Sequence, residues 1–266
     1  MSSNRDETTI TSRHNLCDTS ERHSGRLWEI DALRGLAVVL MVVFHLTWDL
    51  RFLGLVAVDV FSRPWQIFAR GIGSLFIFLL GISLVLSSTR APSRALLLRS
   101  TVQRASLLFG LGVVVTAATA LFAGAGYVRF GILHLLGAAT LLALLALAAS
   151  AWASGLAGAL MVVLGAWLNT LSAPHPWLLW LGVPQAGVVM VDYYPLLPWA
   201  GVALLGVAAG QVAYPLGRRG FRLPELSSSP MVWALQALGR RSLVIYLLHQ
   251  PLLLALLLGL RWLSEQ

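Results

Sequence analysis

Four ionisable side chains interrupt an apolar stretch near the start of the chain. In "DALRGLAVVLMVVFHLTWDL", Asp31 and Arg34 lie at one end, and His45 and Asp49 lie at the other. In an α-helix, the eleven positions from Arg34 to His45 return to within about 20° of the same direction, so the four side chains share one stripe. They also cover roughly 16 Å along the axis, which predicts two clusters, with Asp31 and Arg34 at salt-bridge spacing.

Charged groups inside a membrane are costly and tend to mark function. Two simpler interpretations remain open. Arg34 can extend to the lipid headgroups while Asp31 caps the helix, and His45 and Asp49 can form an interfacial pair.

The last apolar stretch, "GRRSLVIYLLHQPLLL", carries a second polar face. Ser242, Tyr246 and His249 are spaced i, i+4 and i+7, which places them on one side of a helix. Gln250 adds an amide, and Pro251 removes a backbone hydrogen bond and should bend the helix. A polar face with a bend indicates a cavity, although the same side chains can simply join neighbouring helices by hydrogen bonds.

Two more candidates lie toward the same end of the bundle as His45. Asp192 precedes an apolar stretch in "DYYPLLPWAG" and is a candidate to orient the His45 imidazole. His134, in "RFGILHLLG", is equally well explained as a hydrogen-bonded core histidine. No HExxH motif, cysteine pair or i,i+4 histidine pair is present, so the sequence predicts no metal site.

The composition indicates the kind of protein that positions these residues. Of 266 residues, 58% are hydrophobic and 11% charged, and the mean hydropathy is +0.78. A soluble domain has about 25% charged residues, so these values indicate an integral membrane protein. The net charge of +8 comes from arginines alone, most of which lie between apolar stretches, where topology signals belong; this argues against nucleic-acid binding. Cys17 is the single cysteine, and residues 1–25 are expected to form a disordered cytoplasmic tail.

Apolar stretches of about 20 residues predict the membrane-spanning helices. We expect an all-α integral membrane protein, a polytopic bundle of about seven transmembrane helices that makes residues 26–266 a single domain. The seven ranges are 29–48, 67–88, 105–123, 131–149, 153–171, 195–214 and 242–260. The short stretch 176–191, broken by Pro184, is expected to lie at the interface, re-enter the membrane or form an eighth half-span.

The arginines also predict the orientation. With the N-terminus in the cytoplasm, most of them fall in inner segments, and the arginine-free segment 172–194 falls outside. We therefore expect a multi-pass protein of the cell (inner) membrane, with its C-terminus outside. Gly206 and Gly210 are four residues apart and should let helices pack closely. A homodimer through such small-residue helices and binding of membrane lipids to the basic inner loops are further expectations.

The motifs together are similar to those of a known family. "EIDALRGLAVVLMVVFH", "FIFLLGISLVLSS", "GILHLLGAATLL", "DYYPLLPWAGVALLGVAAG" and "LGRRSLVIYLLHQPLLL" resemble the bacterial branch of the heparan-alpha-glucosaminide N-acetyltransferase catalytic-domain family. The likeness covers about residues 28 to 260 in patches. The spacing of Arg34 and His45 is also similar to that of the acyltransferase-three family of membrane sugar acyltransferases. The animal members of the first family have asparagine at the position of His45, so a catalytic His45 follows the second family.

The resemblance implies transfer of an acyl group, often acetyl from acetyl-CoA, to a carbohydrate amine or hydroxyl across the membrane. Arg34, beside Asp31, would hold the phosphate-bearing donor near the cytoplasm, and His45 would act as general base on the acceptor at the outer side. Asp49 or Asp192 would fix the His45 tautomer. The donors to the oxyanion and the substrate would come from Tyr246, His249, Gln250 and His134.

Two other functions would use the same side chains. Intramembrane aspartate, arginine and histidine can line the path of a transporter or flippase or relay its protons. Such proteins often contain inverted repeats, and none is visible here. In a structural or regulatory membrane protein, the polar side chains would only hold the helices together.

Overall fold

A computed structural model describes residues 27–122, 124–188, 190 and 192–264, and these residues form helices and connecting loops without a β-strand. The predicted tail, 1–25, lies outside the described residues. The α-helices are α1 (Trp28–Phe52), α2 (Arg63–Arg90), α3 (Arg94–Phe122), α4 (Ile132–Ala146), α5 (Ala151–Leu168), α6 (Leu196–Ala213), α7 (Pro230–Arg240) and α8 (Ser242–Ser264). Three short 3₁₀ helices are η1 (Gly124–Gly126), η2 (Pro176–Leu178) and η3 (Pro215–Gly217).

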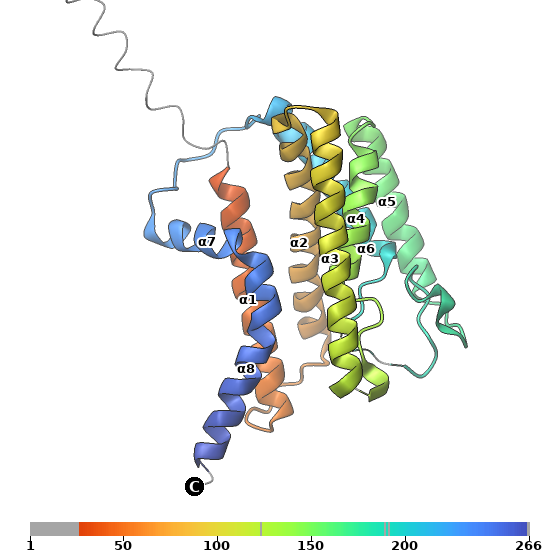
Figure 1. Cartoon of the computed structure of the whole chain (residues 1–266), viewed down its shortest axis with the longest axis vertical. Coiled ribbons are helices and arrows are strands. Elements are labelled where there is room, and N and C mark those ends of the chain that lie inside the picture. Colours follow the sequence, from red (N-terminus) through yellow and green to blue (C-terminus); the bar gives the residue numbers. More distant parts are fainter. Residues whose placement is uncertain (1–26, 123, 189, 191, 265–266) are drawn as a thin grey trace, which may run out of the picture.

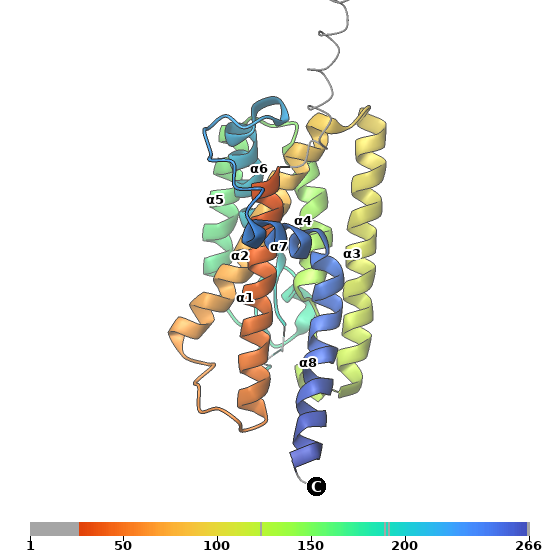
Figure 2. The same cartoon turned by 90° about the vertical axis from the view of Figure 1, so that its left-hand side faces the viewer.

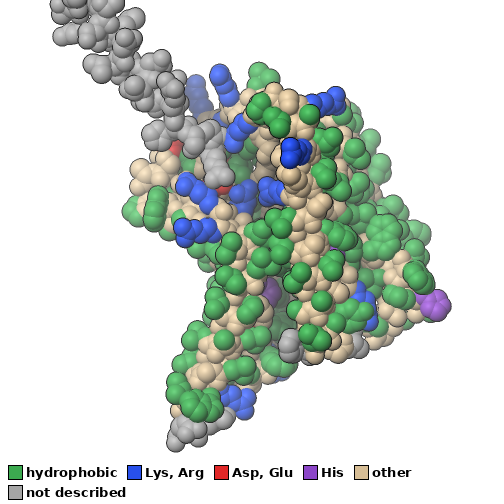
Figure 3. All heavy atoms as spheres, in the orientation of Figure 1, with side chains coloured by type: hydrophobic (Ala, Val, Ile, Leu, Met, Phe, Trp, Pro, Cys, Tyr) green, Lys and Arg blue, Asp and Glu red, His purple; other side chains and the backbone are tan. Residues whose placement is uncertain are grey.

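Each of the seven predicted spans corresponds to one helix, which confirms the polytopic all-α fold. Six helices are long and apolar enough to cross a membrane, and α4 is a shorter apolar helix of 15 residues. The seven run alternately up and down, so the two ends of the described chain lie at opposite ends of the bundle (Figure 1). Large apolar side chains cover the outer surface along the helices, as expected for a surface that faces lipid (Figure 3).

The stretch 176–191 does not supply an eighth membrane-length helix in its described part. It begins with η2 and continues in turns, and Ala173 pairs with Gln185 in an isolated bridge. The Tyr193 hydroxyl donates to the Leu179 carbonyl oxygen at 2.9 Å, which fixes this loop against the start of α6. Gly182 has a φ of +135°, a conformation that suits glycine and turns the chain back.

Helices α2, α4, α5 and α6 form a packed body. An added Cβ at Gly81 of α2 would meet the Ala203 carbonyl oxygen, and one at Gly206 would meet that of Phe78. An added Cβ at Gly210 would press on Val85. The predicted role of Gly206 and Gly210 in close helix packing is therefore confirmed, and it rests on backbones in near contact.

Helices α1, α7 and α8 form an arm beside this body. Helix α1 contacts α2, α7 and α8, and the pair α1 and α8 runs side by side along the lower half of α1 (Figures 1 and 2). The short helix α7 crosses α1 (Figure 1) and contacts it. Its buried residues are Val232, Gln236 and Gly239, which share one helix face. The sequence did not predict α7, because eleven residues are too few to register as a membrane span.

Candidate functional site

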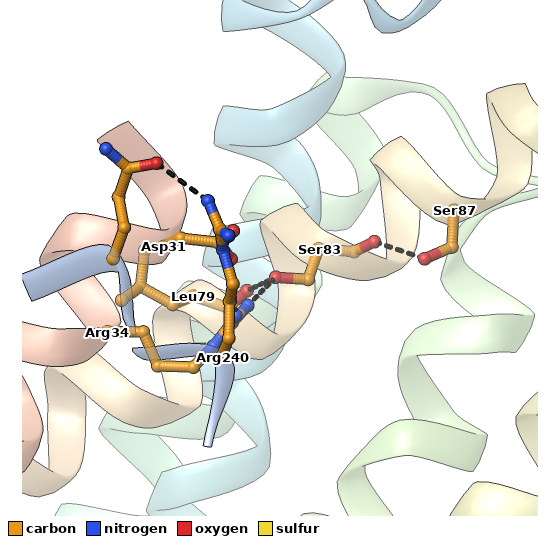
Figure 4. A network of polar contacts seen from close by, with 7 residues as sticks. Asp31, Arg34, Leu79, Ser83, Ser87 and Arg240 are labelled. Atoms are coloured by element: carbon orange, nitrogen blue, oxygen red, sulfur yellow. Dashed lines mark hydrogen bonds and ion pairs between the residues drawn. The ribbon is translucent and has the colours of Figure 1, made fainter. Parts of the chain in front are cut away.

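The first polar cluster lies near the N-terminal end of α1. Arg34 Nη1 donates to Asp31 Oδ1 at 3.0 Å, so the predicted salt bridge is present. Arg34 Nη2 donates to the hydroxyl of Ser83 on α2 at 2.8 Å (Figure 4). The Ser83 hydroxyl in turn donates to the Leu79 carbonyl oxygen at 2.6 Å. Arg34 is thereby held between α1 and α2, with its side chain 20% exposed.

A second arginine approaches the same carboxylate from α7. Arg240 Nε lies 3.5 Å from Asp31 Oδ2, and Arg240 Nη2 donates to Gln236 Oε1 at 3.0 Å (Figure 4). The role of Arg240 in this cluster could not be predicted from the sequence, because its position depends on the crossing of α7 over α1. The available signal was the "GRRS" sequence directly before the last polar helix.

The second cluster lies further along α1 and joins it to α8. The imidazole rings of His45 and His249 have centroids 4.7 Å apart at an interplanar angle of 75°. Gln250 Nε2 donates to Asp49 Oδ1 at 2.8 Å, and Asp49 is 3% exposed. Four residues that the sequence placed on two separate helices are therefore brought together.

Backbone carbonyl groups fix the tautomers of both imidazoles. His45 Nδ1 lies 2.9 Å from the Met41 carbonyl oxygen, and His249 Nδ1 lies 2.7 Å from that of Tyr246. A carbonyl oxygen only accepts, so each Nδ1 carries the proton and each Nε2 of the neutral ring presents a lone pair. The hydrogen bond that fixes the His45 tautomer is thus made within α1, to Met41. The partner expected from the sequence was Asp49 or Asp192.

Three buried acceptor atoms in this cluster have no hydrogen-bond partner among the described residues. They are His249 Nε2, Asp49 Oδ2 and Gln250 Oε1. Leaving a buried polar atom unpaired costs about 1–3 kcal/mol, so such atoms mark places where a partner is expected. All three are acceptors, and a ligand that pairs with them must bring N–H or O–H groups.

The third group contains His134 and Asp192. Asp192 Oδ2 accepts from the Ile132 N–H at 3.0 Å, at the start of α4. The Gly131 N–H donates to His134 Nδ1 at 3.3 Å, so His134 carries its proton on Nε2, the reverse of His45 and His249. Burial raises the pKa of Asp192, which precedes α6, to about 6, and the Ile132 N–H opposes that rise.

Tyr246 connects the second and third groups. Its ring centroid is 5.8 Å from that of His249, and Tyr246 borders the same narrow gap between the helices as His134, Asp192 and Gly112. A Cβ at Gly112 would collide with the His134 ring, so glycine is needed there for α3 to pass this side chain. The candidate site thus runs from the α1–α8 pair to the start of α4.

The structure separates the predicted residues into two places. One place contains five residues of α1 and α8: His45, Asp49, Tyr246, His249 and Gln250. Tyr246 in turn lies next to His134 and Asp192. Asp31 and Arg34 lie apart from them, because eleven helical positions separate Arg34 from His45 by roughly 16 Å. Within the described part of the chain, no group of three or more histidine, cysteine, aspartate or glutamate side chains is arranged to hold a metal ion.

A separate ion pair ties the beginning of α1 to the loop after α6. Glu29 accepts from Arg219 Nε at 2.8 Å and from Arg219 Nη2 at 2.7 Å. The Tyr214 hydroxyl donates to Glu29 Oε1 at 3.4 Å, and Arg219 also lies over the Trp28 ring. Burial, together with the Glu29 carboxylate, raises the pKa of Tyr214 to about 12. Sequence analysis could not find this pair, which joins residues 190 positions apart.

The fold and the site define a class of protein: a multi-pass helical membrane protein with polar side chains gathered between its helices. A model of the family "heparan-alpha-glucosaminide N-acetyltransferase, catalytic" matches residues 26–251. The chain belongs to this family of transmembrane acetyltransferases, which confirms the resemblance and the prediction of an acyltransferase. Neither the curated proteins nor the solved structures yielded a match. Family membership favours the enzyme over the transporter and scaffold alternatives.

Proposed function

We propose that this protein moves an acetyl group from acetyl-CoA to a carbohydrate amine or hydroxyl at the outer side of the membrane. The observation that carries the proposal is the facing pair of imidazoles, His45 and His249, each with Nε2 available as an acceptor. A neutral imidazole with a free Nε2 is suited to take a proton from an attacking amine or hydroxyl.

His45 acts as general base in this proposal. The acceptor nitrogen or oxygen attacks the thioester carbonyl carbon while its proton moves to His45 Nε2, and the coenzyme A thiolate leaves as the tetrahedral intermediate collapses. His249 Nε2, Asp49 Oδ2 and the Gln250 carbonyl accept hydrogen bonds from other N–H and O–H groups of the acceptor. A carbohydrate carries several such groups, which matches a site with three unpaired buried acceptors.

The negative charge on the former carbonyl oxygen needs hydrogen-bond donors. The Tyr246 hydroxyl and His134 Nε2–H are the donors beside this site, because the Gly131 N–H already occupies His134 Nδ1. Asp192 holds the first turn of α4 through the Ile132 N–H and thereby positions His134. The Gln250 Nε2 amide donates to Asp49 Oδ1, so Gln250 also positions that carboxylate.

The phosphate groups of the donor bind at Arg34, beside Asp31. A separation of roughly 16 Å along α1 between Arg34 and His45 suits a donor whose long flexible arm carries the acetyl group away from its phosphates. In this arrangement the donor enters from the cytoplasm and the acetyl group leaves at the other side.

The proposed orientation places the N-terminus in the cytoplasm and the C-terminus outside the cell membrane. Arginines gather toward the end of the molecule at which α1 begins (Figure 3), which agrees with the tendency of basic loops to stay in the cytoplasm. Homodimer formation and binding of anionic lipids by these loops stay predictions.

The test is transfer of radiolabelled acetyl from acetyl-CoA to glucosamine by the purified protein in liposomes. His45→Ala should lower the rate by at least about 100-fold, in the range for loss of a general base. His175→Ala is the matched control, because His175 is exposed in the loop after α5. Transfer at the wild-type rate by the His45→Ala protein would refute the general-base role. A wild-type protein that transfers acetyl to none of a panel of amino sugars and sugars would refute the proposed reaction.

A further inference from the structure

The short helix α7 brings a second guanidinium to the carboxylate that holds Arg34. We propose that Arg240 is a phosphate-binding residue and that, together with Arg34, it forms the site for the phosphate groups of the acyl donor. The inference rests on the proposed function, and it adds a binding residue from a helix that the sequence did not reveal.

Backbone contacts fix the position of Arg240. A Cβ at Gly35 would collide with the Leu235 carbonyl, and a Cβ at Gly239 would collide with that of Asp31. Helix α7 therefore lies directly on α1 at these two glycines. Arg240, the last residue of α7, follows Gly239 and must lie next to Asp31.

Two guanidinium groups converge on Asp31. Asp31 Oδ1 accepts from Arg34, and Asp31 Oδ2 lies 3.5 Å from Arg240 Nε, so one carboxylate serves two guanidinium groups. The buried Gln236 holds Arg240 Nη2 and orients the planar group. The Arg240 side chain is 49% exposed, so a ligand from solution can reach it. Two arginines presented together suit a diphosphate, because guanidinium groups pair with phosphate oxygens in a planar, two-pronged geometry.

An arginine followed by a histidine occurs in both chain segments of the arm. Helix α1 carries Arg34 and, further along, His45. Arg240 at the end of α7 leads into α8, which carries His249. The two arginines meet at Asp31, and the two histidines meet with ring centroids 4.7 Å apart. The arm is thus built for a ligand with an anionic group at one end and a reacting group at the other.

Arg241 provides the comparison that separates this site from general surface charge. It is the next residue in the chain and is exposed, and it carries the same charge. If positive charge near the membrane surface were sufficient, Arg240 and Arg241 would contribute equally.

The experiment is calorimetric titration of coenzyme A into the full-length protein in an uncharged detergent. Coenzyme A carries the phosphates without the acetyl group, so binding is measured without turnover. Loss of one charge-assisted contact predicts that Arg240→Gln weakens binding by about 10-fold or more. Arg240→Lys keeps the charge without the planar fork and should weaken binding by about 3-fold. Arg241→Gln should change it by less than about 2-fold, since exposed charges contribute little.

Several results would overturn the inference. Equal binding by the wild type and Arg240→Gln would overturn the role of Arg240 alone and leave Arg34 as the donor site. Equal weakening by Arg240→Gln and Arg241→Gln would show general surface charge. A wild-type protein that does not bind coenzyme A would overturn this inference together with the donor in the proposed function.

Two controls address folding and a lipid ligand. Thermal unfolding of each variant is followed by circular dichroism. If Arg240→Gln does not fold, the binding of coenzyme A by Arg240→Lys and by the wild type is compared to test the role of Arg240. A parallel titration uses short-chain phosphatidylglycerol, the other source of a phosphate ligand at this surface. Binding of that lipid that depends on Arg240, without binding of coenzyme A, would overturn the assignment to the acyl donor.

Discussion

The body and the arm of this protein are held together in different ways. In the body, α2, α5 and α6 approach through glycines, as at Gly81 against Ala203. In the arm, α7 also meets α1 at glycines, but α1 and α8 meet through polar side chains, and several buried polar atoms there lack partners among the described residues. A helix pair that needed only to be stable would not leave acceptors such as Asp49 Oδ2 unpaired, because each costs free energy. The difference indicates that the body supplies stability and the arm supplies chemistry.

The largest expected effect is on activity in the arm. His249→Ala should slow acetyl transfer by about 100-fold, because it removes an Nε2 acceptor beside His45. The melting temperature should change less than the rate, because His249 Nε2 has no partner among the described residues and His249 Nδ1 bonds to a carbonyl of its own helix. Parallel rate and melting measurements on Leu248→Ala, an exposed neighbour, provide the control. Equal losses of rate in both variants would contradict a specific role for the His249 imidazole.

The second prediction concerns stability in the body. Gly81→Ala should destabilise the protein by about 3 kcal/mol, because the new Cβ would press on the Ala203 carbonyl and force α2 away from α6. Gly71→Ala, on the same helix, should have little effect, since nothing lies within 4 Å of a Cβ there. Thermal unfolding of the two variants measures the contrast. An unchanged melting temperature for Gly81→Ala would contradict the close packing described for the body.

The third prediction tests the ion pair that ties the start of α1 to the loop after α6. Glu29→Gln should destabilise the protein by about 2 kcal/mol, because Arg219 loses a two-pronged partner that is largely buried. Glu225→Gln removes the exposed carboxylate 3.6 Å from the same guanidinium and should leave the melting temperature almost unchanged. Acetyl transfer measured below the melting temperature should be the same in both variants. A selective loss of transfer in Glu29→Gln would extend the site to the start of α1.

The smallest expected effect is the dependence of stability on pH that Asp192, which precedes α6, contributes. The pKa of Asp192 is about 6 in the folded protein against its ordinary value of 3.8, so the folded state keeps this proton to a higher pH. Stability should therefore fall as pH rises from about 4 to about 6 and stay constant above that range. The change should be about 1 kcal/mol, because the side chain is only partly buried and solvent reduces the effect. Asp192→Asn should remove this slope, while Asp59→Asn, in an exposed loop, should retain it.

Much of the arm could be predicted from the sequence, because its features follow from spacing along one helix. The Asp31–Arg34 salt bridge and the shared face of Tyr246 and His249 are local, and local geometry is set by 3.6 residues per turn. The facing of His45 and His249 depends instead on how α1 packs against α8. No periodicity within either helix contains that information.

Other features depended on contacts between distant segments. Helix α7 is too short for a membrane-span signal, so the position of Arg240 was not predicted. The Met41 carbonyl oxygen, which fixes the His45 tautomer, could not be recognised from the sequence, because every residue has a backbone carbonyl whereas Asp49 and Asp192 stand out as carboxylates. Asp192 was expected near His45, and in the structure its hydrogen bond goes to the start of α4.

The contacts of α7 with α1 at Gly35 and Gly239 restrict how the helices of the arm can shift relative to one another. A slide of α8 along α1 by one helical residue, about 1.5 Å, would drive the α7 backbone into that of α1 at both crossings. The two glycine contacts oppose such a slide. The segment that carries Arg240 and His249 is therefore anchored on α1 at both ends, by the backbone contacts of α7 and by the contact of the His45 and His249 rings.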